Sequence, residues 1–465
     1  MSFVHPYMPN SAPAVQREML DELGINCIED LYRDLIPEHL RFRGQMNLPR
    51  PILGEFELKK HVEDILKQNI SCNEYVSFLG AGCYQHYVPA ICDEINSRSE
   101  FLTAYCGDTY CDHGKMQAIF EYCSMMAELV DMDVVSYTNY DGGQAVASSL
   151  RMALRITGKS ELLLPATMNP EILSLVRDYC KHVGKIKLVN YTAKGLLDLV
   201  DLENKLSDKT AAVFFENPSY LGFIETQGKQ IADVAHKAGA ICIVNADAAS
   251  LGILESPANY GADIICGDIQ PLGMHIQFGG GQAGYIASRQ DEAYIQQYPT
   301  YLYGIARTGV QGEYGWGRAL NYRCSHGSRE KAHEYFGTAS GLWAITAAVY
   351  LAVMGPQGMQ ELGETILYRT NYAIKELAEI KGIQANIFGT ANFQEFVVNF
   401  DDCGKTVAEI NKDLLLKGIF GGKDLSREFP ALGQSALYCI TEMISAEDIR
   451  KLSGALREIV GQEGK

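Results

Sequence analysis

Four polar or glycine-rich segments follow short apolar runs, where buried strands would end. They are YDGGQ at 140–144, Asn217-Pro218 after AAVFFE, Asp247 within ICIVNADAASLG, and GDIQPLGMHIQFGGGQAGYIAS at 267–288. Ligands of doubly wound sheets bind beyond the carboxyl ends of the strands. The order and spacing of these four segments therefore make them the candidate binding site.

Two of the segments carry residue types suited to a charged ligand. Gly142 and Gly143 precede a predicted helix, so backbone N–H groups and the helix N-terminus can face an anion such as a phosphate. A tight strand–helix turn would need the same glycines. Asp247 can hold a protonated ring nitrogen, or it can cap the turn that follows it. Both alternatives stay open for each segment.

Strand-like and helix-like segments alternate from about residue 75 to 290. Short apolar runs separated by helices indicate a parallel sheet covered on both faces, so we predict an α/β, doubly wound fold. The helix at 116–130 follows the 3.6-residue period. The predicted strands are 134–136, 161–164, 186–189, 211–215, 241–245 and 263–266, and the other helices are 144–156, 171–183 and 230–238.

The pattern differs at the two ends of the chain. Helices are predicted at 15–23 and 28–35, before a proline-punctuated passage, RFRGQMNLPRPILGEF, which indicates either an extended arm around a partner subunit or a linker. After residue 335, helices (338–354, 359–380, 406–416, 446–460) and strands (395–400, 436–440) form an α+β pattern. The expected division is an N-terminal segment at 1–74, a large α/β domain at 75–335 and a small C-terminal α+β domain at 336–465.

The composition excludes some classes of function. The net charge of −17 argues against binding to a nucleic-acid backbone, which needs a basic patch. Nothing in the sequence approaches the run of about 18 apolar residues that a membrane helix needs. The N-terminus lacks the basic-then-apolar pattern of a signal peptide. The expected location is the cytoplasm.

Thirteen cysteines are present, and most lie in apolar segments, as Cys123, Cys242, Cys266 and Cys439 do. This pattern predicts buried, reduced thiols rather than a disulfide framework. Cys106, Cys111 and His113 form the most polar group. One interpretation of this group is a metal site, although no second Cys-x-x-Cys pair is present to complete a tetrahedral set of ligands. The other is that the two cysteines are free thiols in a loop.

The sequence resembles a known family along nearly its whole length. Matching segments include QREMLDELGINCIEDLY, FLGAGCYQHYVPA, QAIFEYCSMMAEL, YDGGQA, ENPSYLG, NADAASLGILESPANYGADI and GDIQPLG. They are similar to the glycine dehydrogenase (decarboxylating) P-protein family, and in particular to its subunit 1, the α half of two-subunit forms. The resemblance implies the aspartate-aminotransferase type of pyridoxal-phosphate fold (fold type I), with a parallel-rich doubly wound sheet.

The resemblance also implies roles for residues of the four segments. Asp247 matches the partner of the cofactor ring nitrogen, and residues 140–144 match the glycine turn near the cofactor phosphate. The residues expected at the cofactor site are Tyr140, Gly142, Gly143, Gln144, Asn217 and Asp247.

Gln270 matches the lysine that forms the Schiff base in the cofactor-carrying β half, nine residues before Gly279. A carboxamide cannot form an imine, so no catalytic residue is assigned to this chain. The resemblance implies a heterotetramer (α2β2) with a homologous, lysine-bearing β subunit that holds pyridoxal phosphate. Its implied reaction is decarboxylation of glycine, with transfer of the aminomethyl group to a lipoyl carrier protein.

Two polar loops depart from the family pattern, at 106–114 and 298–337, and Asn169 stands where a histidine is common. Drift at surface loops is one explanation. The other explanation is that the chain belongs to a paralogous enzyme acting on a different amino acid. A third alternative for the chain's function is a non-catalytic regulatory or scaffold partner. By charge type, the candidate carboxylate or phosphate clamps are Arg307, Arg318, Arg323 and Arg329.

Overall fold

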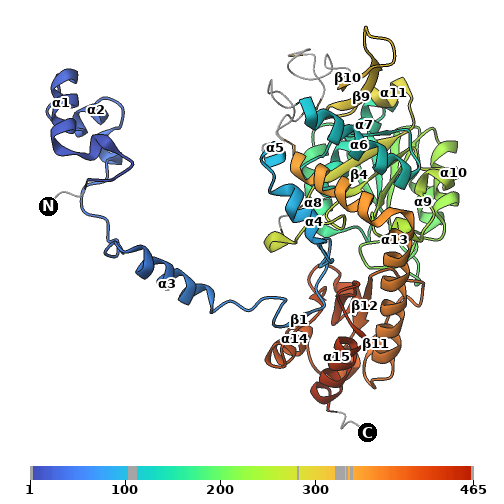
Figure 1. Ribbon diagram of the computed structural model, residues 1–465. Helices are drawn as coiled ribbons and strands as arrows, with labels where there is room; N and C mark the ends of the chain where they lie inside the picture. Colours follow the sequence, from blue (N-terminus) through green and yellow to red (C-terminus); the bar gives the residue numbers. More distant parts are fainter. Residues whose placement is uncertain are drawn as a thin grey trace. The chain divides into compact units, whose positions relative to one another are not determined.

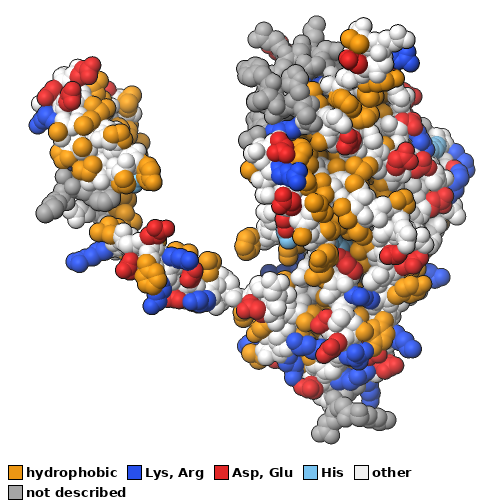
Figure 2. Space-filling model, in the orientation of Figure 1, with side chains coloured by type: hydrophobic (Ala, Val, Ile, Leu, Met, Phe, Trp, Pro, Cys, Tyr) orange, Lys and Arg blue, Asp and Glu red, His pale blue; other side chains and the backbone are white. Residues whose placement is uncertain are grey.

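A computed structural model describes residues 4–102, 113–279, 282–319, 330, 334–335 and 339–461. The chain forms two units, Met1–Ile70 and Ser71–Lys465. The first unit contains η1 (Pro9–Ser11), α1 (Pro13–Leu23), α2 (Glu29–Tyr32), η2 (Glu38–Leu40) and α3 (Glu55–Leu66). None of the residues in these five helices is buried, and Figure 2 shows many hydrophobic side chains at the surface of this unit.

A seven-stranded sheet forms the centre of the second unit (Figure 1), with strand order β2-β8-β7-β6-β5-β3-β4. The strands from β3 to β7 are parallel, whereas β8 is antiparallel to both β7 and the edge strand β2. The predicted α/β, parallel-rich class is therefore confirmed, with a mixed edge. The bounds are β2 (Val134–Val135), β3 (Glu161–Pro165), β4 (Lys185–Val189), β5 (Thr210–Asn217), β6 (Ile241–Ala246), β7 (Ile264–Asp268) and β8 (Gly284–Ser288).

Both faces of this sheet are covered, because successive strand residues point to opposite sides. On β3, Leu163 joins a core that includes Ile119 of α6 (His113–Val130). Its neighbour Leu162 joins a second core with residues of α7 (Gly142–Thr157) and α8 (Pro170–Cys180). The remaining helices of this region are α4 (Ala90–Asn96), α5 (Ser99–Leu102), α9 (Leu199–Lys205), α10 (Gly228–Lys237), η3 (Ser250–Gly252), η4 (Pro257–Tyr260), η5 (Gln277–Gly279) and α11 (Glu292–Ile295).

The predicted buried thiols are present in these layers. Cys123, Cys242, Cys266 and Cys439 are all buried and free. Burial raises the pKa of each thiol, which keeps them protonated and unreactive. Cys106 and Cys111 lie outside the described residues, as does the side chain of His113.

A second, antiparallel sheet lies towards the C-terminus, with order β11-β12-β15-β14. Its core includes buried residues of α14 and α15. Neither the pairing of β1 with β13 nor the hairpin of β9 and β10 was predicted from the sequence. The bounds are β1 (Val76–Ser77), β9 (Leu302–Arg307), β10 (Tyr314–Ala319), β11 (Gln384–Ala385), β12 (Glu395–Asn399), η8 (Asp401–Cys403), α14 (Val407–Leu416), β13 (Ile419–Phe420), β14 (Lys423–Asp424), η9 (Pro430–Leu432), β15 (Ser435–Cys439) and α15 (Ala446–Ile459).

Helix α13 (Gly341–Ala378) runs from the large sheet to the side of the small sheet (Figure 1). The sequence predicts two helices here, and the structure joins them across a kink at Gly355, which has φ 59° and precedes Pro356. Among the described residues, α13 is the one helix whose length and composition would suit a membrane span. Core helices of soluble proteins pass the same test, and 44% of its apolar window is buried.

Candidate functional site

A cavity of about 510 Å³ opens at the carboxyl ends of β5, β6 and β7. Its walls come from the loop at 80–84, the start of α7, the start of α8 and the residues after those three strands. This is the position at which doubly wound sheets bind ligands. The residues singled out in the sequence that line the cavity include Gly142, Gly143, Asn169, Pro218 and Asp247. The predicted cofactor-site residues Tyr140, Gln144 and Asn217 are not among the lining residues.

The glycine turn at the start of α7 is closed by side chains of the chain itself. The N–H of Gly142 donates to Oδ2 of Asp268 at 2.7 Å. The N–H of Gln144 donates to Oδ1 of Asp141, the N-cap residue, at 2.6 Å. The Oε1 atom of Gln144 accepts from the N–H of Tyr140 at 2.9 Å. The turn therefore presents its first donors to carboxylates from the protein.

Residue 142 favours glycine because the turn packs tightly on the end of β7. A Cβ atom added there would lie 3.0 Å from Cβ and 3.1 Å from the backbone nitrogen of Asp268. Backbone atoms of a central strand cannot move aside cheaply. The glycine thus serves the tight strand–helix approach that the sequence left open as an alternative.

Asp268 lies in the segment at 267–288 that the sequence singled out, but its role was not predicted. It ends β7 and accepts hydrogen bonds from the N–H groups of Gly142 and Gln270, the latter at 2.8 Å. Burial raises its carboxyl pKa to about 7, although both N–H groups act to lower it. Its place at the end of a buried strand, as in the segment IICGD, was the available signal.

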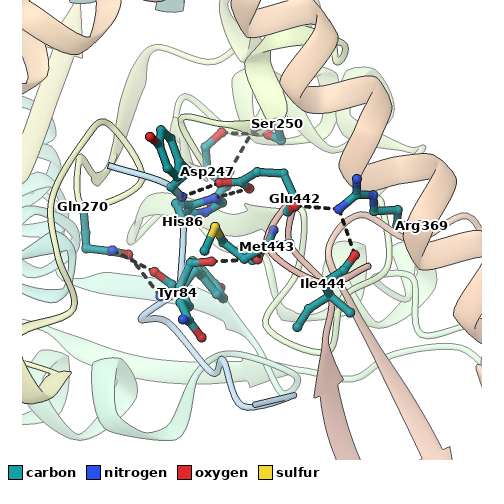
Figure 3. A network of polar contacts seen from close by, with 12 residues as sticks. Tyr84, His86, Asp247, Ser250, Gln270, Arg369, Glu442, Met443 and Ile444 are labelled. Atoms are coloured by element: carbon teal, nitrogen blue, oxygen red, sulfur yellow. Dashed lines mark hydrogen bonds and ion pairs between the residues drawn. The ribbon is translucent and has the colours of Figure 1, made fainter. Parts of the chain in front are cut away.

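Asp247 follows β6 and is engaged within its own turn. Its Oδ1 atom accepts from the N–H of Ser250 at 2.9 Å, as a capping aspartate does. Burial raises the pKa of Asp247, and the charge of His86 lowers it. Oε2 of Glu442 holds the Nδ1 atom of His86 at 2.8 Å (Figure 3).

Gln270 is almost completely buried, with 1% of its surface exposed. Its Oε1 accepts from the N–H of Tyr84 at 3.0 Å, and its Nε2 donates to the carbonyl oxygens of Tyr84 at 2.8 Å and Met274 at 3.1 Å. Figure 3 shows the carboxamide directed at Tyr84. The side chain therefore fastens the loop at 80–87 to the segment after β7.

Glu395 of β12 holds the same loop from the small sheet. Its Oε1 accepts from the N–H of Ala81 at 2.6 Å, and its Oε2 accepts from the hydroxyl of Tyr84 at 3.0 Å. Burial raises the pKa of Glu395 to about 7. Glu442 adds a third attachment, accepting from the N–H of Tyr87 at 2.6 Å.

The lining of the cavity holds more carboxyl groups than basic groups. Among its described lining residues, Lys423 is the only lysine or arginine, and its Nζ donates to the hydroxyl of Tyr220 at 2.8 Å and to Glu428 at 3.0 Å. Burial raises the pKa of Glu216 to about 7. The carboxylates in the lining are Asp141, Glu171, Glu216, Asp247 and Asp268.

Comparison with known proteins identifies the family. The family model for the glycine cleavage system P-protein matches residues 5–455. A protein of Staphylothermus marinus named probable glycine dehydrogenase (decarboxylating) subunit 1 is 38% identical over 468 residues, covering 98% of this chain and 99% of that protein. A protein of the same name from Bacillus pumilus is 37% identical, covering 96% of this chain and 97% of its own. The chain belongs to the glycine cleavage system P-protein family.

Solved structures agree with this assignment. A crystal structure of glycine decarboxylase (P-protein) of the glycine cleavage system, in inhibitor-bound form, superposes with a TM-score of 0.84 at 31% identity, covering 98% of this chain and 100% of that one. A sphingosine-1-phosphate lyase of Burkholderia pseudomallei, at 13% identity and a TM-score of 0.64, shares the fold alone. The predicted P-protein resemblance and the pyridoxal-phosphate fold type I are thus confirmed.

The residues around the cavity do not fit pyridoxal phosphate. A phosphate needs free N–H donors at the turn, and in this P-protein chain Asp268 and Asp141 take the donors of Gly142 and Gln144. A bound phosphate would also face the carboxylates of the lining with Lys423 as the one described cation. No reaction step is therefore assigned to a cofactor in this cavity.

Several predicted site residues lie apart from the cavity. Asn217 is not among its lining residues, and its side chain donates to the hydroxyl of Tyr260 at 3.1 Å and accepts from the N–H of Glu225 at 3.0 Å. Arg307 lies on the β9–β10 hairpin, and the Arg318 guanidinium stacks 4.4 Å over the ring of Tyr301. The other two arginines, Arg323 and Arg329, lie outside the described residues.

Proposed function

We propose that this chain is subunit 1 of a heteromeric glycine decarboxylase of the glycine cleavage system, active only with a lysine-bearing partner. The observation that carries the proposal is the near end-to-end similarity to proteins named subunit 1, combined with glutamine at position 270. The word "subunit" in those names supports a partner of the same assembly. The division of the chain at 1–74, 75–335 and 336–465 is part of this proposal.

Gln270 stands where the partner carries its Schiff-base lysine. A carboxamide cannot form an imine, and the sequence holds no lysine between Lys237 and Lys331 that could replace it. The three hydrogen bonds of Gln270 support this reading, because they give the residue a structural use that a lysine could not fulfil. Bound to the partner, pyridoxal phosphate would supply the electron sink for decarboxylation.

This chain's own contribution is to complete the partner's active site in an α2β2 heterotetramer. Tyr140, Gly142, Gly143, Gln144, Asn217 and Asp247 are proposed as counterparts, by position, of the partner's cofactor-binding residues. The small amino-acid substrate is glycine, and a lipoyl carrier protein accepts the aminomethyl group. We place the assembly in the cytoplasm, without nucleic-acid or membrane partners.

The first unit supports assembly with another chain. Its helices have no buried residue, and α3 exposes Leu58, Val62 and Ile65 at helical spacing along one face. Apolar stripes of this kind are normally covered in the assembled state. We assign this stripe to the lysine-bearing subunit.

Co-expression with the candidate partner tests the proposal. The tagged chain is expected to retain a homologous protein that carries the lysine, with the cofactor absorbance on that partner. The mixture, and neither chain alone, is expected to catalyse exchange of carbon dioxide with the carboxyl group of glycine. Retention of a partner without the lysine, or no activity of the pair on any amino acid, would contradict it.

The loops at 106–114 and 298–337, whose sequences depart from the family pattern, favour a second candidate function, a paralogous enzyme that acts on a different amino acid. A panel of amino acids offered to the reconstituted pair separates the two. Competent release of carbon dioxide from glycine, with no better substrate, would reject the paralogue. Loss of activity in Asp247→Asn or Gly143→Ala complexes would reject the third alternative, a non-catalytic scaffold.

A further inference from the structure

The start of α7 faces carboxyl groups that belong to the chain itself. Helix N-termini attract negative charge because their first N–H groups lack partners within the helix and the helix dipole is positive there. Here the Asp268 carboxylate lies 2.7 Å from the nitrogen of Gly142, and Asp141 lies 2.6 Å from that of Gln144. These are the lengths of charge-assisted hydrogen bonds.

Asp268 reaches the turn from a different strand, 126 residues away in the chain. Its second oxygen is fixed by the N–H of Gln270, so the carboxylate has little freedom to leave the turn. The close packing at Gly142, where an added Cβ atom would lie 3.0 Å from Asp268, leaves no room between the two segments. The first N–H group of the turn is thus already paired with a side chain of the chain itself.

We infer that Asp268 is a built-in replacement for the cofactor phosphate, and that this cavity excludes pyridoxal phosphate and other phosphate-bearing ligands even without a covalent link. The inference rests on the proposed function, in which the cavity is the counterpart of the partner's cofactor site. It goes further, because a missing lysine alone would still permit non-covalent binding.

The segments that follow β6 and β7 are consistent with this inference. Gln270 is not among the lining residues, and both ends of its carboxamide form hydrogen bonds to Tyr84 or Met274, so it offers no group to a ligand. Asp247 is engaged with the N–H of Ser250 and interacts electrostatically with His86. Hydrogen bonds within the chain therefore hold both of these segments in place without a cofactor.

Phosphate binding to variants of the full-length chain tests the inference. Isothermal titration with inorganic phosphate is compared between the wild type, Asp268→Ser and Asp247→Asn. Asp268→Ser removes the carboxyl group and frees the N–H of Gly142. Asp247→Asn removes a carboxyl group from the same cavity but leaves the N–H of Gly142 bonded to Asp268. Retention of pyridoxal phosphate after gel filtration, measured by absorbance, is the second readout.

Asp268→Ser is expected to bind phosphate at least about tenfold more tightly than the wild type and Asp247→Asn, and it alone is expected to retain pyridoxal phosphate. Equal binding by all three proteins, or an equal gain in Asp247→Asn, would overturn the inference. Should Asp268→Ser fail to show a cooperative melt, Asp268→Ala, which also frees the N–H of Gly142 and removes the charge, decides in its place by the same comparison. Partner capture by the wild-type chain is scored separately, so failure of the proposed function is distinguishable from failure of this inference.

Discussion

At the residue scale, Gln270 forms hydrogen bonds that require both the oxygen acceptor and the nitrogen donor of a carboxamide. This requirement can be tested by a single substitution. Gln270→Glu would direct a buried carboxylate at the carbonyl oxygens of Tyr84 and Met274. Because an unpaired buried charge is costly, we expect the free energy of unfolding to fall by about 2–4 kcal/mol. Chemical denaturation of the purified chain measures it.

The matched control for Gln270→Glu is Gln290→Glu, at an exposed position of the same chain. It makes the same chemical change without burial, so its effect should stay within about 0.5 kcal/mol. Equal stability of the two variants would show that Gln270 does not fasten the loop at 80–87.

Glu216 gives a pH-dependent prediction. Its pKa is raised to about 7 by burial, from 4.5, so the folded protein holds a proton there that the unfolded chain has released. The contribution of Glu216 to the free energy of unfolding therefore falls as pH rises from about 4.5 to 7, and it is constant above that range. Glu216→Gln cannot ionise and removes this dependence.

Thermal melts at pH 5 and pH 8 check the prediction for Glu216. The difference in melting temperature between Glu216→Gln and the wild type should favour the variant more at pH 8 than at pH 5. For Glu203→Gln, on the exposed side of α9, this difference should be the same at both pH values. A Glu216→Gln protein whose stability follows the wild-type pH dependence would contradict the raised pKa.

At the scale of elements, the contact between α7 and β7 determines the shape of the cavity. Gly142→Ala would place a methyl group about 3.0 Å from Asp268 and 3.1 Å from its backbone nitrogen. We expect a loss of about 1–3 kcal/mol in the free energy of unfolding, typical of overpacking. In Gly454→Ala, within α15, nothing lies within 4 Å of the new methyl group. That control should raise stability by about 0.5–1 kcal/mol, so an equal loss in both variants would refute the tight contact.

The elements around the site could be predicted where local periodicity specifies them. The predicted strands at 211–215 and 241–245 correspond to β5 and β6, because apolar runs of strand length identify a buried parallel sheet. The antiparallel pairing of β8 and β2 could not be predicted, since it depends on contacts between segments about 150 residues apart in the chain. The hydrogen bonds from the N–H of Gly142 to Asp268 and from the N–H of Tyr84 to Gln270 span 126 and 186 residues. No local pattern encodes them.

At the scale of the whole molecule, the two units differ in how they are stabilised. Among the described residues, the four hydrophobic cores consist of residues from Ser71–Lys465. Within Met1–Ile70, the described helices have no buried residue. The stability of the isolated chain therefore comes from the second unit, and the apolar residues of the first are available for assembly.

This difference predicts separable effects on stability and assembly. A variant of α3 with Leu58, Val62 and Ile65 all changed to serine should melt within about 2 °C of the wild type, because these side chains are exposed. It should nevertheless lose most of its capture of the lysine-bearing partner, since the apolar stripe would no longer be available to bury. The control changes three polar residues of the same region, Lys60, Glu63 and Lys67, to serine and should capture the partner normally. Equal capture by the two triple variants would show that the partner does not cover this face of α3.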